Sequence, residues 1–206
     1  MNIIIFGSTG KTGTVLLKEL LKSDHKLSVY VRSPEKLRKY KDKISIFTGS
    51  IGDQNQIKIA LQGQDLIMST FGSRTLRKTN VQEIFMQNLV AAMESEHKER
   101  LIALSAWGAG TSHKENTLLL NILQATLLRN MFNDKNKGEA FILRSSLDYT
   151  LIRPGRITNQ NSSKIVKASV VKDGLSTTIS RGNLVKFMIE QIDSDTWSKK
   201  ALIIGY

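Results

Sequence analysis

Three glycines spaced three residues apart, Gly7, Gly10 and Gly13, follow directly after a short apolar run near the start of the chain. The run, from Ile3 to Phe6, is continuously apolar, which is typical of a strand buried on both faces of a sheet. Apolar residues at helical spacing then continue to Leu21. The chain therefore begins with a strand, a tight glycine turn and a helix that buries one side.

The same alternation of short apolar runs and helical patterns continues along the chain. Further strands are predicted at residues 27–31, 44–47, 66–70, 101–104, 149–152 and 201–204, and helices at 57–61, where Gly63 follows, and at 81–93. Strands that alternate with helices pair in parallel through right-handed crossovers. We find no internal repeat or low-complexity linker, so we predict one α/β domain over residues 1–206, with a Rossmann-type doubly wound parallel sheet and helices on both faces.

Two later segments depart from this pattern. Residues 118–132 are apolar around most of a helical circumference, so we expect a helix buried in the domain, with a subunit contact as the alternative. Residues 164–171 and 177–179 are predicted as short strands around a turn at Asp173 and Gly174, forming an insertion that helps to wall a pocket.

Composition narrows the classes of function. The 206 residues carry a formal charge of +12, but the lysines are scattered and no nucleic-acid-binding signature accompanies them, so we expect a solvated basic surface rather than a nucleic-acid partner. Cysteine is absent, which excludes disulfides, thiolate nucleophiles and Cys-ligated metals. A lone His113 gives no metal site. No apolar run reaches the roughly 18 residues of a membrane span, and we expect a cytoplasmic protein.

The glycine turn has the character of a phosphate-binding loop. Glycines permit a close approach of the backbone, and the N-terminus of the following helix offers free N–H groups to phosphate oxygens. The spacing Gly-x-x-Gly-x-x-Gly differs from the commonest dinucleotide fingerprint, and the upstream glycine is too close for a Walker A loop. We predict that a dinucleotide binds along this loop, which comprises Gly7, Ser8, Thr9, Gly10, Lys11, Thr12 and Gly13.

These residues and several later landmarks resemble the atypical short-chain dehydrogenase/reductases of the NAD(P)H-binding, NmrA-like group, including its biliverdin-IXβ/flavin reductase branch. The resemblance spans almost the whole chain, through residues 29–37, 104–108, 148–155 and 179–181. It implies a nicotinamide cofactor and an oxidoreductase activity. It specifies the substrate hardly at all.

The end of the second strand decides which nicotinamide cofactor we expect. A carboxylate there would hydrogen-bond the ribose hydroxyls and repel a 2′-phosphate, but this chain offers Arg32 and Ser33. A guanidinium can form a forked contact with a phosphate. We therefore expect NADP(H) in preference to NAD(H).

Two other segments follow strands at the same edge of the predicted sheet. The resemblance implies adenine contacts near Ser50 and Ile51, although Ser50 replaces the aspartate that related proteins often have there. Asp53 is predicted to be a helix N-cap. Thr70, Phe71 and Gly72 follow the fourth strand, where the family's chain passes over the cofactor ribose.

The residues for proton transfer depart from the family's pattern. Ser105 stands where many short-chain reductases have their serine, and Lys135 falls in the register of their lysine. The register of the tyrosine, which donates a proton to the substrate oxygen, holds Met131 instead. A tyrosine-dependent alcohol dehydrogenase is therefore disfavoured.

Two classes of function stay open. The first is a reductase that passes hydride to a small acceptor such as a flavin or quinone, with Pro154 and Gly155 bordering the nicotinamide and Ser105 holding the carboxamide or the acceptor. The second is a redox sensor that binds NADP(H) with little turnover. Trp107 either stacks on a planar substrate or packs under the loop. We expect a monomer or homodimer.

Overall fold

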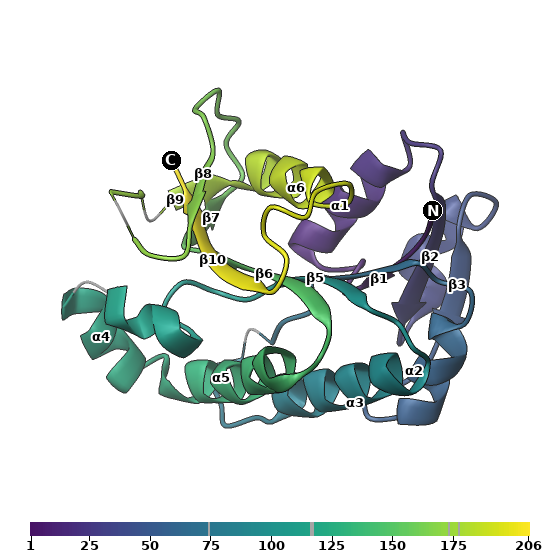
Figure 1. Cartoon of the computed structure of the whole chain (residues 1–206), viewed down its shortest axis with the longest axis horizontal. Helices are drawn as coiled ribbons and strands as arrows, with labels where there is room; N and C mark the ends of the chain where they lie inside the picture. Colours follow the sequence, from purple (N-terminus) through teal and green to yellow (C-terminus); the bar gives the residue numbers. More distant parts are fainter. Residues whose placement is uncertain (74, 116–117, 173, 177) are drawn as a thin grey trace.

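The computed structural model describes residues 1–73, 75–115, 118–172, 174–176 and 178–206. At its centre is an eight-stranded sheet in the order β3-β2-β1-β4-β5-β6-β10-β8 (Figure 1). Seven of the strands are parallel, and β8 pairs with β10 in antiparallel fashion. The strands are β1 (Asn2–Phe6), β2 (Lys26–Val31), β3 (Ser45–Thr48), β4 (Leu66–Ser69), β5 (Arg100–Leu104), β6 (Asp148–Pro154), β8 (Lys167–Ser169) and β10 (Lys200–Gly205).

Helices cover both faces of this sheet. In Figure 1, α1 (Lys11–Leu20) and α6 (Arg181–Glu190) lie on one side, and α2 (Gln54–Leu61), α3 (Val81–Ser95) and α5 (Arg129–Arg144) lie on the other. The predicted doubly wound Rossmann-type sheet is thus confirmed.

The pleat of β1 explains why its apolar run is continuous. Ile3 and Ile5 belong to the core cluster that contains the buried residues of α1 and α6. Ile4 and Phe6 point to the opposite face and join the cluster formed with α2, α3 and α5. Because both faces are covered, each position of the strand must be apolar.

The predicted strands and the first helices lie within one to four residues of the observed bounds, but the second half of the chain contains helix that the sequence analysis missed. Helix α6 was not predicted, and α5 continues to Arg144, well beyond residue 132. In α5 the buried positions form a narrow stripe among charged and amide residues: Phe132, Asp134, Gly138, Glu139 and Ile142.

The prediction of one buried helix over residues 118–132 was wrong. The segment divides into α4 (Leu118–Ala125) and the start of α5, and α4 has no buried residue. Leu118 is 77% exposed and Leu119 is 68% exposed. Helix α4 lies at one end of the molecule beside α5 (Figure 1), where too few described elements surround it to cover its circumference. The alternative, a contact with another subunit, stays a prediction.

The predicted insertion forms two small strands with different partners. Strand β9 (Thr178–Ser180) pairs in parallel with β7 (Arg156–Thr158), whereas β8 extends the main sheet. Of the predicted turn, Asp173 lies outside the described residues. The segment places β7 beside the carboxyl end of β6, which is the end relevant to the site.

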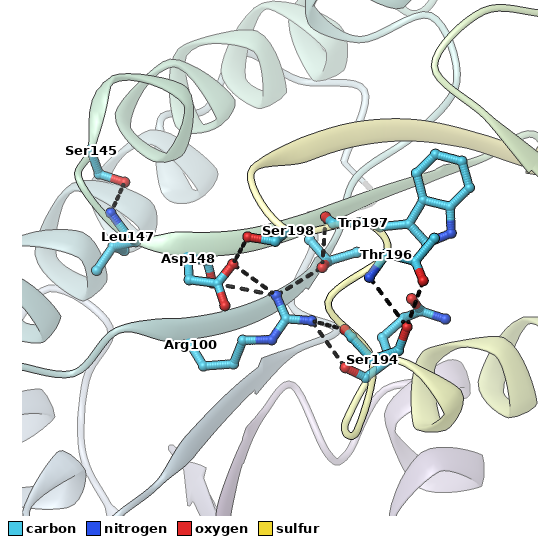
Figure 2. Close-up of polar contacts among 10 residues, drawn as sticks. Arg100, Ser145, Leu147, Asp148, Ser194, Thr196, Trp197 and Ser198 are labelled. Atoms are coloured by element: carbon cyan, nitrogen blue, oxygen red, sulfur yellow. Dashed lines mark hydrogen bonds and ion pairs between the residues drawn. The ribbon is translucent and has the colours of Figure 1, made fainter.

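A polar network at the opposite, amino ends of β5 and β6 anchors the C-terminal part of the chain (Figure 2). The Arg100 guanidinium donates to Thr150 Oγ1 at 2.9 Å and to the Gln191 carbonyl oxygen at 2.9 Å, and it pairs with Asp148 Oδ1 at 3.4 Å. Ser198 also donates to Asp148. These charges hold two strands and the loop before β10 together, so their role is structural.

None of the helices in the described parts of the chain is long and apolar enough to cross a membrane.

The contrast between α1 and α4 gives a stability prediction. Leu17→Ala removes a fully buried side chain of α1 and should lower the free energy of unfolding by about 2–5 kcal/mol. The matched change Leu119→Ala, on the exposed face of α4, should change it by less than about 0.5 kcal/mol. Urea unfolding followed by circular dichroism measures both. A large loss for Leu119→Ala would show that α4 is buried against something in solution.

Candidate cofactor and acceptor site

The order of the strands defines where a ligand can bind. Strand β1 pairs with β2 on one side and with β4 on the other, so the chain reverses its direction of winding beside β1. In open parallel sheets, ligands bind at the carboxyl ends of the strands beside such a reversal. The glycine loop leaves β1 at this end.

Two glycines of the loop are required by the fold itself. Gly7 has φ +79°, and a Cβ there would lie 2.6 Å from the backbone nitrogen of Phe71. A Cβ on Gly13 would collide with the Gly7 carbonyl oxygen and with Thr70 Oγ1. The loop is therefore pressed against the segment that follows β4, which only glycine permits.

Gly10 is the N-cap of α1 and differs from the other two. Its nearest contact for an added Cβ is the Gly7 carbonyl oxygen at 3.2 Å. No described side chain caps α1, and its first turn holds no acidic residue. The start of this helix thus presents N–H groups and the positive end of the helix dipole without a protein anion to neutralise them.

One cavity of about 300 Å³ lies between the glycine loop and the ends of β2 and β3. Tyr30 forms part of its wall and donates to the Ser50 carbonyl oxygen at 2.8 Å. Burial, with the nearby charge of Asp53, raises the pKa of Tyr30 to about 12. The wall consists of Phe6, Gly7, Thr9, Tyr30, Val31, Arg32, Gly49, Ser50, Ile51, Phe71 and Val81.

Arg32 stands at the rim of this cavity as predicted, with its side chain exposed. It forms no hydrogen bond or ion pair with any residue that the structure describes. Ser33 is the N-cap residue of the 3-10 helix η1 (Pro34–Tyr40) and does not line the cavity. Ser33 is therefore next to Arg32 at the predicted site, but it does not contribute to the wall of the cavity.

The segment after β3 is held by its own turn contacts. Ser50 Oγ accepts from the Gly52 N–H, and the Ser50 N–H donates to Gln56 Oε1. Ser50 therefore lines the cavity, but its hydroxyl oxygen is engaged in a hydrogen bond within the turn. Asp53 accepts from the Gln56 N–H at 3.1 Å and is the N-cap of α2, which confirms the predicted role.

A second cavity, of about 580 Å³, lies on the other side of the glycine loop. Gly7, Thr9 and Phe71 line both cavities, so the two cavities adjoin at the loop. The remaining residues around the second cavity are Gly10, Lys11, Thr12, Thr70, Gly72, Ser73, Leu104, Ser105, Ala106, Met131, Lys135 and Ile157. The two cavities thus offer space on both sides of the glycine loop for the two halves of a dinucleotide.

Ser105 and Lys135, 30 residues apart in sequence, line this second cavity together. The Ser105 N–H donates to the Ile152 carbonyl oxygen, which fixes the residue at the end of β5. Its Oγ is buried and has no hydrogen-bond partner among the described residues. A buried hydroxyl without a partner is costly, so a ligand that bonds to it would remove that cost.

Lys135 reaches the cavity from α5. Burial lowers the pKa of Lys135, although the carboxylates of Glu139 and Asp134 act in the opposite direction. Met131, one helical turn earlier, also lines the cavity. The thioether of Met131 cannot transfer a proton, so the position expected for a catalytic tyrosine is chemically inert in this respect.

Several predicted site residues lie outside the walls of the two cavities. Pro154 is buried at the end of β6, where its carbonyl oxygen accepts from the backbone N–H of Trp107, and Gly155 follows it. Ile157 of β7 lines the second cavity in their place. Ser8 is fully buried. Trp107 packs with Leu175 and Ile203, which favours the packing interpretation over stacking on a substrate.

The structure also shows contacts that sequence reasoning missed. Arg181, at the start of α6, donates to Thr12 Oγ1 in the glycine loop and to Asn159 Oδ1. Arg181 had been noted only as a landmark of the resemblance. A separation of 169 residues between donor and acceptor leaves no local signal that could have assigned the contact.

Comparisons with known proteins agree with this geometry. The sequence model of the NAD(P)H-binding family matches residues 7–195. The chain belongs to this family. Among curated proteins, the UPF0659 protein YMR090W of Saccharomyces cerevisiae is 20% identical over 204 residues, covering 93% of this chain and 87% of that protein.

Solved structures share the fold at low sequence identity. The oxidoreductase ylbE from Lactococcus lactis superimposes with a TM-score of 0.85 at 23% identity, covering 100% of this chain and 90% of that one. A short-chain dehydrogenase/reductase from Veillonella parvula, in complex with NADP, gives 0.84 at 17% identity and covers 100% and 94%. ChuY from Escherichia coli O157:H7, described as an anaerobillin reductase, gives 0.83 at 17% identity and covers 100% and 97%. The atypical short-chain reductase resemblance is thereby confirmed at the level of the fold.

Gly10 allows a direct test of the loop because an added Cβ there makes one tight contact, at 3.2 Å with the Gly7 carbonyl oxygen, whereas a Cβ at Gly7 or Gly13 collides with the backbone. Gly10→Val should leave the protein folded and abolish NADPH binding, since the new side chain occupies space that a pyrophosphate needs. Calorimetric titration measures the affinity. Gly182→Val, at an exposed position with no atom within 4 Å of the added Cβ, is the control. Unchanged NADPH affinity in folded Gly10→Val would refute the assignment.

Proposed function

We propose that this protein is an NADP(H)-dependent reductase that transfers hydride to a small conjugated acceptor such as a flavin or quinone. The chain has an NAD(P)H-binding, oxidoreductase-type fold. The observation that carries the proposal is the second cavity. It adjoins the glycine loop and holds an unpartnered Ser105 hydroxyl and Lys135, but its described wall contains no tyrosine.

The absence of a tyrosine from the described cavity wall bears on the class of acceptor. Reduction of an isolated carbonyl places negative charge on one oxygen, which a positioned acid must protonate. A conjugated acceptor spreads the charge of the incoming hydride over its ring system, and water can then supply the proton. The reduced nicotinamide loses one hydride and the acceptor gains one hydride and one proton. Rate acceleration then depends mainly on positioning the two rings.

Two comparisons support this class of reaction. ChuY is described as a reductase, and the Veillonella parvula protein was crystallised with NADP. Both share the fold over the whole of this chain. Their identity to this chain is low, so the acceptor of this protein depends on the residues of its own cavity.

Arg32 supports a preference for NADP(H). Its guanidinium stands at the rim of the first cavity and is not engaged by a described residue. Residues 32–35 contain one acidic residue, Glu35, in the exposed first turn of η1 rather than on the cavity wall. A 2′-phosphate would pair with the guanidinium through charge-assisted hydrogen bonds, which a ribose hydroxyl cannot equal.

Arg32→Ala should therefore weaken NADPH binding by about tenfold or more while leaving NADH binding nearly unchanged. The measurement is calorimetric titration with each nucleotide. Arg38→Ala, an exposed arginine of η1 outside the cavity wall, is the matched control. Equal losses for both nucleotides would mean that Arg32 does not contact the 2′-phosphate.

A redox sensor that binds NADP(H) without turnover is the competing function. Met131 favours the sensor because it stands in the position where the related reductases have their catalytic tyrosine. Oxidation of NADPH by the purified protein, assayed with flavin and quinone acceptors, separates the two. Turnover supports the reductase. Tight NADPH binding without turnover across the panel supports the sensor, and failure to bind either nucleotide contradicts both.

Ser105 provides a test of the reductase chemistry. Ser105→Ala removes the hydroxyl that we expect to orient the carboxamide or the acceptor, so the rate of acceptor reduction should fall by about tenfold with little change in NADPH affinity. Ser95→Ala, whose hydroxyl bonds only to the Ala92 carbonyl oxygen in α3, is the control. If neither rate nor affinity changes in Ser105→Ala, the serine has a structural role alone.

A further inference from the structure

Lys135 lies in the second cavity without an anionic partner. Its side chain is half-buried at the cavity wall and forms no hydrogen bond or ion pair with any residue in the described ranges. A partly desolvated ammonium group is stabilised by a counter-charge in direct contact with it. An anion bound in the cavity would provide such a contact.

Neither of the nearby carboxylates can supply that charge to the cavity. The two oxygens of Asp134 accept from the N–H groups of Gln82 and Glu83 at 3.1 and 3.0 Å, and so cap the start of α3. Glu139 is equally engaged, since its Oε2 accepts from Arg153 at 2.6 Å and its Oε1 accepts from the same guanidinium at 3.3 Å. Both carboxylates are therefore committed to structural contacts.

The wall of the cavity has a single sign of charge. Among the described residues that line it, Lys11 and Lys135 are basic and none is acidic. Lys11 is the first residue of α1, so it lies at the helix start where the phosphates of a dinucleotide would sit. Lys135 comes from α5 and shares its part of the wall with Met131 on the same helix. The two cations thus come from different elements.

We propose that Lys135 binds a carboxylate or phosphate group of the hydride acceptor, so that the site selects conjugated acceptors that carry an anionic substituent. This inference rests on the proposed reductase function and adds the charge of its substrate. The unpartnered Ser105 hydroxyl would meet a neutral polar atom of the nicotinamide or the ring, while Lys135 holds the charged substituent. Lys135 is in this sense a specificity-determining residue.

The test uses FMN and riboflavin, which have the same ring but differ in one phosphate. Equilibrium binding of each to the NADP⁺-loaded protein and steady-state reduction by NADPH are measured separately for the wild type and for Lys135→Met. Loss of a charge-assisted contact should weaken FMN binding and raise its KM by about tenfold, with riboflavin and NADPH affinity unchanged. Lys135→Arg should retain part of the preference for FMN.

Lys137→Met is the matched control, because Lys137 lies two residues away, is exposed and pairs with Glu83. It should leave the ratio of FMN to riboflavin affinity as in the wild type. The inference is overturned if Lys135→Met weakens both flavins equally, if it weakens NADPH instead, or if the wild type binds neither flavin or both alike. Selective FMN binding without turnover would contradict the reductase function but support the anion site. Turnover without selectivity for the charged flavin would support the reductase function but contradict the anion site.

Discussion

The position of α5 at the wall of the second cavity depends on a buried ion pair between Arg153 and Glu139. Arg153 is 1% exposed in β6, and its guanidinium contacts both carboxylate oxygens of Glu139 in α5 and donates to Thr111 Oγ1. Gly110 makes room for the pair, since a Cβ there would collide with both side chains. Removing one partner would leave an uncompensated buried charge, which is strongly destabilising.

The ion pair between Arg153 and Glu139 also determines which side of α5 faces the second cavity. Glu139 lies four residues, or about one turn, after Lys135, so the contact sets the rotation of α5 and with it the side that faces the cavity. Asp134 fixes the same helix against the start of α3, and Gly138 lets the backbones approach, with an added Cβ only 2.9 Å from the Gln82 carbonyl oxygen. Three neighbouring contacts therefore leave α5 little freedom, and they hold Lys135 at the cavity wall, where no described residue forms a hydrogen bond or ion pair with its ammonium group.

The sequence predicted those features that depend on local pattern. The apolar run ending at Phe6, the glycine loop and the Asp53 cap follow from residue type and spacing, and the resemblance placed Ser105 and Lys135 in one site. What it could not predict depends on long-range contacts. No periodic pattern in the sequence indicates the contact between Arg153 and Glu139. The many charged residues of α5 also hide the apolar spacing by which a helix is usually predicted. The leucines of α4 indicated burial, but composition does not say how many neighbours a helix has, and Leu119 is exposed.

Three basic side chains are distributed along the two cavities. Arg32 stands at one end, Lys11 at the helix start and Lys135 at the other end. In a chain with a formal charge of +12, such a sequence of cations would attract an anionic cofactor at long range. Specificity, in contrast, has to come from contacts at short range. Arg32 and Lys135 line different cavities, so under the proposed function selection of the cofactor and selection of the acceptor would depend on separate contacts.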